Sequence, residues 1–381
     1  MTTSTDSKQF VPGLADVVAA QTRLSSVNGL EGELIIAGFP LQEIASQATF
    51  EEMVYLLWND ALPTAAELNE FRQALATQRV LPNATVEVLR EAIEYQLPPM
   101  DALLVGASTL SLDLATSDAH HQAIAVLARF PMIVATYARL LNAQNLPSRR
   151  DDLGHTANYL YMLFGEVPQP EQFRGLETYL NTVVDHGLNA STFTARVITS
   201  TGSDLVSAVV GAIGALKGPL HGGAPGPALD MVFEIGDAAR AETIIREKLS
   251  RRERLMGFGH RVYRTRDPRA EVLSVAAEKM FQQSGDMTLY TLAREVENVA
   301  VRLLAERYPD RNLQTNVEFY TALLLHGLGL STDLFTPTFA ISRVAGWIAH
   351  IFEQKQQSRI IRPESQYIGL RDRRWIPLEQ R

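Results

Sequence analysis

The chain has 381 residues, of which 46% are apolar and 20% charged, and its net charge is −8. This composition is typical of a soluble globular enzyme with a substantial core, and the negative charge argues against general nucleic-acid binding. Because cysteine is absent, disulfides, thiolate catalysis and cysteine-ligated zinc are excluded.

The first residues form neither a signal peptide nor an Arg-rich transit peptide. No stretch approaches the ~20 apolar residues of a membrane span. We therefore expect a cytoplasmic protein with no membrane partner.

In chain order, the first predicted element is a hairpin over residues 25–39, where Asn28-Gly29, a strong tight-turn signal, lies between apolar stretches. Most of the rest has the 3.6-residue periodicity of helices. Predicted helical segments span residues 49–60, 64–79, 101–115, 122–143, 173–187, 205–218, 241–256, 269–285, 289–309, 317–329 and 336–356. The sequence predicts a predominantly α-helical fold.

The segment 205–218 has an unusual small-residue face, with Gly211, Ala215 and Gly218 at helical spacing. Glycine inside a helix costs ~1 kcal/mol relative to alanine, so close approach by another backbone is indicated. A neighbouring helix or a second subunit could supply it. We favour a dimer seam, since two-fold dimers are the commonest assemblies.

Three histidines lie at glycine-flanked breaks between helices: His186, His221 and His260. A lone histidine is more often structural, but loops at element ends carry chemistry, and three such positions weaken the structural interpretation. No two of them share a helical face, so we discount a metal site. The dinucleotide and P-loop motifs are also absent. We interpret the remaining histidines as structural or surface residues: His120, His121, His155, His326 and His350.

Residues 251–269 carry seven arginines against two acids, Glu253 and Asp267. The planar guanidinium suits carboxylate and phosphate recognition. A solvated basic helix end is the alternative, although the glycines and the histidine within this segment favour a binding role.

Seven blocks resemble the citrate synthase family in order and spacing: PPMDALLVGASTLS, DHGLNASTFTAR, KGPLHGGAP, MGFGHRVYRTRDPR, NVEFYTALLL, AISRVAGWIAH and IIRPESQY. The resemblance extends from about residue 25 to about residue 370 and includes the hairpin. It implies a mainly α fold with a large domain formed by residues 1–221 and 331–381, and a small domain over 222–330. The active site would occupy the cleft between them.

The resemblance also implies a homodimer, no metal or other cofactor, and a reaction in which acetyl-CoA and oxaloacetate give citrate and CoA at the entry of the tricarboxylic acid cycle. The chain resembles the short forms without an extra N-terminal regulatory domain. We therefore expect no inhibition by NADH through that domain.

The resemblance gives catalytic roles to three residues. Glu318 corresponds to the base that deprotonates the thioester methyl group. His221 corresponds to the donor to the thioester oxygen, and His260 to the donor to the ketone of oxaloacetate. Such chemistry needs a carboxylate base and donors that stabilise developing oxygen charge.

Binding roles are implied for further residues. Those corresponding to oxaloacetate contacts are His186, Arg269, Arg343 and Arg362, the last reaching across the dimer. Those corresponding to CoA contacts are Gly257, Phe258, Gly259 and Arg264, of which Arg264 would meet a phosphate.

There is one departure, because the family usually has aspartate where this chain has Glu318. Two alternatives stay open. One is 2-methylcitrate synthase, which uses propionyl-CoA and would differ by one methylene, worth only ~1–3 kcal/mol in an apolar pocket. The other is a non-catalytic helical scaffold with a relict site.

Overall fold

The computed structural model describes residues 10–115, 118–222, 225–357 and 359–381. The first nine residues, where no leader peptide is predicted, lie outside the described residues, as does Gly223 in the glycine-rich segment after His221.

A small antiparallel sheet of order β1-β2-β3 begins the chain, with strands Ser25–Asn28, Glu33–Ile36 and Phe39–Pro40. Ser25 pairs with Ile36, and Asn28 pairs with Glu33. The predicted hairpin is confirmed; Asn28 ends the first strand, and the loop to the second strand spans residues 29–32.

Helices form the rest of the fold. The first eleven are α1 Leu41–Ile44, α2 Phe50–Asn59, α3 Ala65–Gln78, α4 Asn83–Glu94, α5 Pro99–Ser108, α6 Ser111–Leu114, α7 Ala119–Leu141, α8 His155–Phe164, α9 Pro170–Val183, α10 Ala190–Ser200 and α11 Leu205–Leu216. Local signals place several boundaries. Thr49 and Glu52, for example, form a reciprocal capping box at the start of α2.

The later helices are α12 Pro225–Ile235, α13 Ala238–Ser250, α14 Pro268–Ser284, α15 Thr288–Arg307, α16 Val317–Gly327 and α17 Phe335–Gln357. Short 3₁₀ turns lie at Pro12–Leu14, Thr332–Leu334 and Leu378–Gln380. The predicted helix over 241–256 ends early because Arg252 adopts a left-handed φ of 60°, and the Glu253 N–H turns back to the carbonyl of Lys248.

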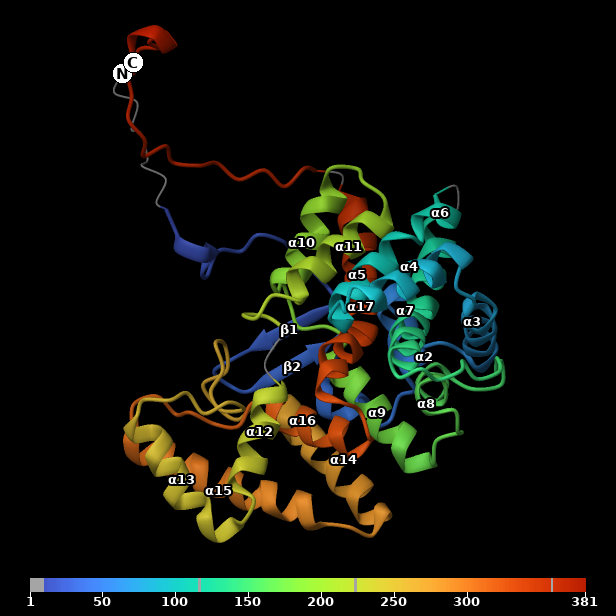
Figure 1. The fold of residues 1–381 in the computed structure, drawn as a ribbon, viewed down its shortest axis with the longest axis vertical. Helices are drawn as coiled ribbons and strands as arrows, with labels where there is room; N and C mark the ends of the chain where they lie inside the picture. The colour runs from blue at the N-terminus through green and yellow to red at the C-terminus, as the bar shows by residue number, and fades with distance from the viewer. Residues whose placement is uncertain (1–9, 116–117, 223–224, 358) are drawn as a thin grey trace.

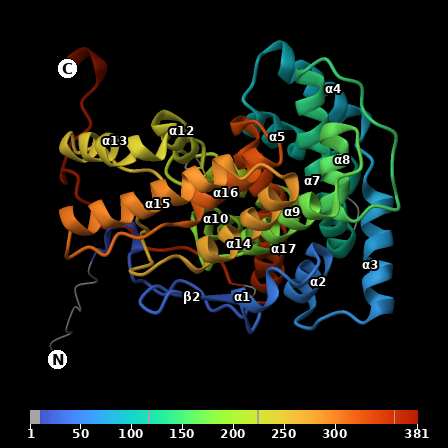
Figure 2. The same ribbon diagram turned by 90° about the horizontal axis from the view of Figure 1, so that it is seen from below.

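The helices form two outer groups with a central set between them (Figures 1 and 2). Both views place α12, α13 and α15 at one end and α3, α4 and α8 at the other, with α9, α14, α16 and α17 between them. The mainly helical prediction is confirmed. The catalytic candidates lie on the central helices and the loops beside them.

Helix α17 binds the end of α9 through a series of side chains. Ser342 donates to the carbonyl of Leu180 at 2.5 Å, and Arg343 Nε donates to that of Val183 at 2.8 Å. The last carbonyls of a helix have no partner within the helix, so these bonds satisfy groups that burial would otherwise leave unpaired. They also fix the point where α9 gives way to the turn that carries His186.

Helix α7 corrects one expectation. It has 23 residues, and its most apolar 18-residue window has a mean hydropathy of 1.6, so by length and composition it could cross a membrane. However, 78% of its apolar window is buried within the fold, as in the core helix of a soluble protein. No other helix of 18 or more residues among those described passes the same test.

Gly211 in α11 is approached from within the chain. A Cβ there would lie 2.2 Å from Cδ1 of Ile198 in α10. This intrachain packing explains Gly211, whereas Gly214 is exposed on the outer surface of the same helix. The dimer seam therefore remains a prediction that concerns this outer surface.

The C-terminal segment after α17 leaves the helical body as an extended arm (Figure 1). Its root is held where the Ile361 N–H donates to Ser200 Oγ at 3.0 Å. Arg362 follows and is exposed to solvent.

Candidate active site

The turn after α9 brings His186 against the loop that carries His260. The two imidazole rings lie 5.9 Å apart at 80°, and the ring of Tyr263 packs on both. His186 Nε2 lies 3.1 Å from the Tyr263 hydroxyl. Burial, followed by the charges of Arg269 and Arg343, lowers the pKa of His186 well below its ordinary value, so this imidazole is neutral.

His260 has a defined tautomer. The backbone N–H groups of Val262 and Tyr263 donate to Nδ1 at 3.0 and 3.1 Å, so in the neutral ring the proton resides on Nε2. Burial and then Arg269 lower the pKa of His260 to about 4. Nε2 lies 3.2 Å from Nη2 of Arg269, which can only donate. Two donors therefore face the same space, and an acceptor from a ligand would satisfy both.

The tautomer of His221 is also defined by its hydrogen bonds, but here the accepting nitrogen is Nε2 and not Nδ1. The Ser191 N–H donates to its Nε2 at 3.4 Å, and Ser191 Oγ lies 2.8 Å from the same atom. Trp347 Nε1 donates to that hydroxyl at 3.1 Å. Burial, with a contribution from Arg343, lowers the pKa of His221 to about 4. The imidazole is neutral, and its Nδ1–H remains available as a donor.

Glu318 lies in the first turn of α16, where Asn316 caps the helix by accepting the Glu318 N–H at 3.0 Å. Among the residues that the structure describes, none donates a hydrogen bond to its carboxylate. Burial raises the pKa of Glu318 to about 7, against the lowering effect of Arg269. A carboxylate with this pKa is matched to general-base work near neutral pH.

The segments that carry His260 and Glu318 are paired directly. Phe258 forms an antiparallel bridge with Thr315, and the Gly259 N–H donates to the carbonyl of Gln314 at 2.7 Å. Asn316 donates from its backbone to Gly257 and from its side chain to Gly259. The same asparagine therefore starts the Glu318 helix and holds the glycine-flanked segment before His260.

Asp267 ties the start of α14 to the start of α16. It is buried and accepts from Arg269 Nε at 3.0 Å and Nη2 at 2.8 Å, while its Oδ2 lies 3.3 Å from the Val317 N–H. This two-point pairing holds the guanidinium of Arg269 in one orientation.

Arg343 is 2% exposed and lies 4.5 Å above the ring of Phe339. Burial lowers its pKa to about 10, so it stays charged at neutral pH. Its Nε donates to Val183, but its Nη groups donate to none of the described residues. A buried guanidinium with free donors indicates an anion site.

The charge of Arg343 acts on the ionisation of His186, His221 and Glu318 alike. These predicted residues are therefore gathered with His260 and Arg269 around one region. Arg264 is exposed, and only its backbone is fixed, by donation to Gly29 at 2.8 Å. Arg362 is exposed in the segment after α17, and no contact with these residues is seen within the described part of the chain.

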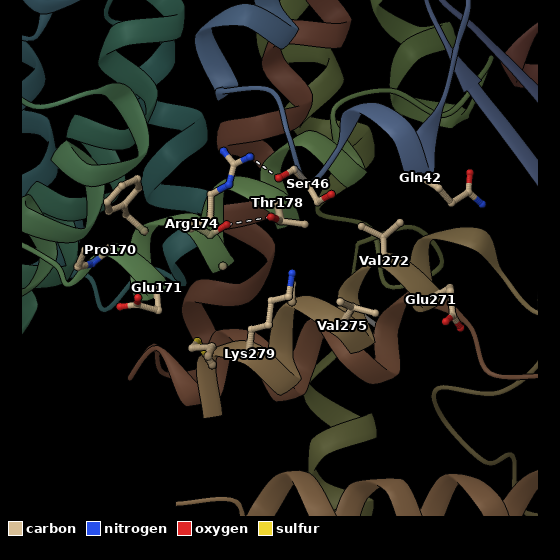
Figure 3. A pocket seen from close by; sticks show the side chains of 14 residues that line it. Gln42, Ser46, Pro170, Glu171, Arg174, Thr178, Glu271, Val272, Val275 and Lys279 are labelled. Atoms are coloured by element: carbon tan, nitrogen blue, oxygen red, sulfur yellow. Dashed lines mark hydrogen bonds between the residues drawn. The ribbon is translucent and has the colours of Figure 1, made fainter. Parts of the chain in front are cut away.

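A separate hollow of about 540 Å³ lies between α9 and α14 (Figure 3). Val272, Val275 and Lys279 of α14 face Thr178 and Arg174 of α9 across it. It contains none of the predicted site residues. It lies beside the direct contact between the helix that ends near His186 and the helix that begins near Arg269.

Sequence reasoning missed several residues that position the site: Ser25, Asp185, Ser191, Tyr263, Asp267 and Trp347. Asp185, Ser191, Tyr263 and Asp267 lie inside or beside the quoted blocks, so inspecting neighbours of the histidines would have found them. Trp347 also lies inside a quoted block, near His350, whereas Ser25 precedes the quoted blocks and offers no such local signal. No group of three or more potential metal ligands is gathered within the described ranges.

A family model described as citrate synthase, C-terminal domain, matches residues 13–364. The chain belongs to the citrate synthase family. Citrate synthase 2 of Bacillus subtilis is 39% identical to it over 375 residues, covering 97% of this chain and 98% of the relative. A 2-methylcitrate synthase of Shewanella oneidensis is 38% identical, with 97% of each chain covered.

Solved citrate synthases share the fold. The enzyme of Pyrobaculum aerophilum has a TM-score of 0.87 at 38% identity, covering 97% of this chain and 95% of the other. The ternary complex of the Thermoplasma acidophilum enzyme with carboxymethyl coenzyme A and oxaloacetate has a TM-score of 0.84 at 29% identity, covering 96% and 97%. The comparisons confirm the predicted family, the helical fold and the acyltransferase class.

Proposed function

We propose that this protein condenses acetyl-CoA with oxaloacetate and hydrolyses the citryl-CoA formed, releasing citrate and CoA. One observation carries the proposal. Glu318, a carboxylate with a pKa near neutrality, lies in the field of Arg269 and Arg343, and the same two cations act respectively on His260 and His221, neutral imidazoles that each retain one N–H. The Thermoplasma relative, solved with a CoA analogue and oxaloacetate, supports the substrate assignment.

In the first step, Glu318 removes a proton from the methyl group of the thioester. The C–H electron pair becomes the enolate double bond, and charge develops on the thioester oxygen. His221 donates its Nδ1–H to that oxygen. A neutral donor stabilises the enolate without protonating it fully, and a lost donor of this kind typically costs ~3–4 kcal/mol.

In the second step, the enolate carbon attacks the ketone carbon of oxaloacetate. His260 donates its Nε2–H to the ketone oxygen, which becomes the hydroxyl of the product. Arg269 and Arg343 bind the carboxylates, and His186 contacts oxaloacetate beside them. Such pairing orients the ketone for attack as well as binding it. Water then cleaves the thioester and releases the CoA thiol.

Gly257, Phe258 and Gly259 would meet CoA along their backbone, and the exposed Arg264 would contact a phosphate. Residues 222–330 would form the small domain that closes over oxaloacetate against the rest of the chain. Arg362 would reach the site of the second subunit in a homodimer. The chemistry calls for no metal or cofactor, and the cytoplasm is the expected compartment.

The experiment is release of free thiol from acetyl-CoA and from propionyl-CoA, each with and without oxaloacetate. We expect oxaloacetate-dependent release with a higher kcat/KM for acetyl-CoA. A preference for propionyl-CoA would make the protein a 2-methylcitrate synthase, as in the Shewanella relative. No release with either thioester would favour a non-catalytic scaffold.

A further inference from the structure

Within the described residues, one side chain of strand β1 forms hydrogen bonds with the turn that carries His186. The Ser25 hydroxyl donates to Asp185 Oδ2 at 2.5 Å, and the Gly187 N–H donates to Ser25 Oγ at 2.7 Å. Asp185 and Gly187 are the two sequence neighbours of His186. One hydroxyl therefore holds both ends of the peptide segment that presents the imidazole.

The directions of these two bonds are fixed by the charge of Asp185. Burial alone would raise the pKa of this carboxyl, but His350 and then Arg343 hold it below its ordinary value, with a contribution from Ser25. An ionised carboxylate only accepts, so the Ser25 proton goes to Asp185. The lone pairs of Ser25 Oγ are then free to accept the Gly187 N–H.

The other side of Asp185 is anchored in the core. Its Oδ1 lies 3.2 Å from Nε2 of His350, whose Nδ1 accepts from Arg196 at 3.1 Å. All three residues are fully buried. The Asp185 carboxylate is therefore held in one position. Because Ser25 is bonded to this carboxylate and also to the Gly187 N–H, it holds Gly187 in place as well.

The turn needs such a restraint. Helix α9 ends at Val183, and Gly187 has a φ of 59°, in the left-handed region, so His186 lies in non-helical backbone that the helix does not hold. The His186 side chain itself is bonded to Tyr263, on the loop that also carries His260. Without the Ser25 clamp, the His186 turn loses its side-chain hydrogen bonds to the N-terminal sheet within the described residues.

We propose that Ser25 is a positioning residue for oxaloacetate binding, which acts by clamping the His186 turn through Asp185 and Gly187. This inference rests on the proposed contact of His186 with oxaloacetate. It gives the N-terminal hairpin a role in the site, although no residue of β1 belongs to the reacting set.

The test compares Ser25→Ala with Ser26→Ala, the exposed neighbour on the same strand. We expect Ser25→Ala to raise the KM for oxaloacetate about tenfold, since it removes a hydrogen bond to a charged group. The KM for acetyl-CoA should change less than twofold, and Ser26→Ala should match the unaltered enzyme. Ser25→Thr keeps the hydroxyl and should restore most of the affinity.

Hydrogen exchange provides a second measurement in the dimeric, unliganded enzyme. Amides of 185–188 should exchange faster in Ser25→Ala, whereas those of 258–263 should not. An unchanged KM for oxaloacetate, equal increases for both substrates, or a Ser25→Thr variant as impaired as Ser25→Ala would overturn the proposal. In the same assay, His186→Ala with an unchanged KM for oxaloacetate would instead refute the assigned function of His186.

Discussion

Glu318 places its carboxylate one methylene farther from the backbone than aspartate would. A misplacement of ~1 Å in a reacting group can cost 10²-fold in rate, so the surroundings must compensate. The helix start is fixed by Asn316, which is itself bonded to Gly257 and Gly259. We infer that this pairing sets the base against the segment that would hold CoA, and that the longer stem spans the remaining distance.

The residue that controls the pH profile should be Glu318. Its pKa is raised to about 7, and the carboxylate is the active form, so kcat/KM should fall as the pH drops through about 7. The pKa values of His221 and His260 are lowered to about 4, so both imidazoles stay neutral donors throughout this range. Initial rates between pH 5 and 9 at subsaturating acetyl-CoA measure this dependence of kcat/KM on pH.

Two variants control the assignment. Glu318→Gln should bind oxaloacetate but lose kcat by ~10²–10⁴, the usual worth of a general base. In Glu318→Asp, kcat/KM should still fall as the pH drops, but the pH at half-maximal kcat/KM should differ from that of the unaltered enzyme. Near-full kcat in Glu318→Gln, or the same midpoint in Glu318→Asp, would show that another group titrates.

At the scale of the element, α17 organises the site because it lies directly on the end of α9. Gly346 is the point of closest approach, where a Cβ would lie 2.3 Å from the carbonyl oxygen of Val184 and 3.1 Å from Asp185 Oδ1. Arg343 and His350 are one turn before and one turn after Gly346. The absence of a side chain at Gly346 therefore lets both contact the His186 turn.

Gly346→Ala should destabilise the protein even though alanine is the better helix former. Helix propensity favours alanine by ~1 kcal/mol, but the new methyl group would overlap backbone atoms, and overpacking costs ~1–3 kcal/mol. The overlap is with backbone, which cannot turn away, so the cost should be in the upper half of this range and the net loss in the free energy of unfolding about 1–2 kcal/mol. Urea unfolding followed by circular dichroism measures it.

Gly175→Ala in α9 is the matched control, because its Cβ would meet only the flexible side chain of Met280 at 3.6 Å. Alanine there should be neutral or stabilise by up to ~1 kcal/mol. Equal effects at both positions would show that packing against Val184 is not what requires glycine at 346.

Local patterns predicted the long helices and the hairpin because caps and periodicity lie within a few residues. Helix α13 shows the limit, since nothing local marked the left-handed Arg252 that ends it. The contacts that orient the site are harder to predict from local patterns, because they join residues far apart in the sequence. Ser25 and Asp185 are 160 residues apart, and Ser191 and Trp347 are 156 apart. One sequence does not indicate that such pairs meet, whereas the family blocks placed the histidines, Arg269 and Arg343 together.

At the scale of the molecule, the reacting groups come from two separate parts of the chain. His186 lies in the turn after α9 and Arg343 in α17, while His260, Arg269 and Glu318 belong to loops and helices between 257 and 327. Helices α9 and α14 pack on each other beside the hollow, and we expect this contact to shift when the site closes (Figure 3). An enolate must be kept from water, so we expect oxaloacetate to drive closure before acetyl-CoA binds.

This movement can be measured with a pair of labels, since the chain has no cysteine to interfere. Glu171→Cys and Lys279→Cys place paramagnetic labels on opposite walls of the hollow. Labelled chains diluted with unlabelled ones report distances within one subunit. Saturating oxaloacetate should shift the Glu171–Lys279 distance by several ångströms. A control pair at Glu70 and Glu171, both outside residues 222–330, should not move. If both distances stay constant, and oxaloacetate also leaves the small-angle scattering unchanged, the site is already closed. In that case α9 and α14 do not move relative to each other when oxaloacetate binds.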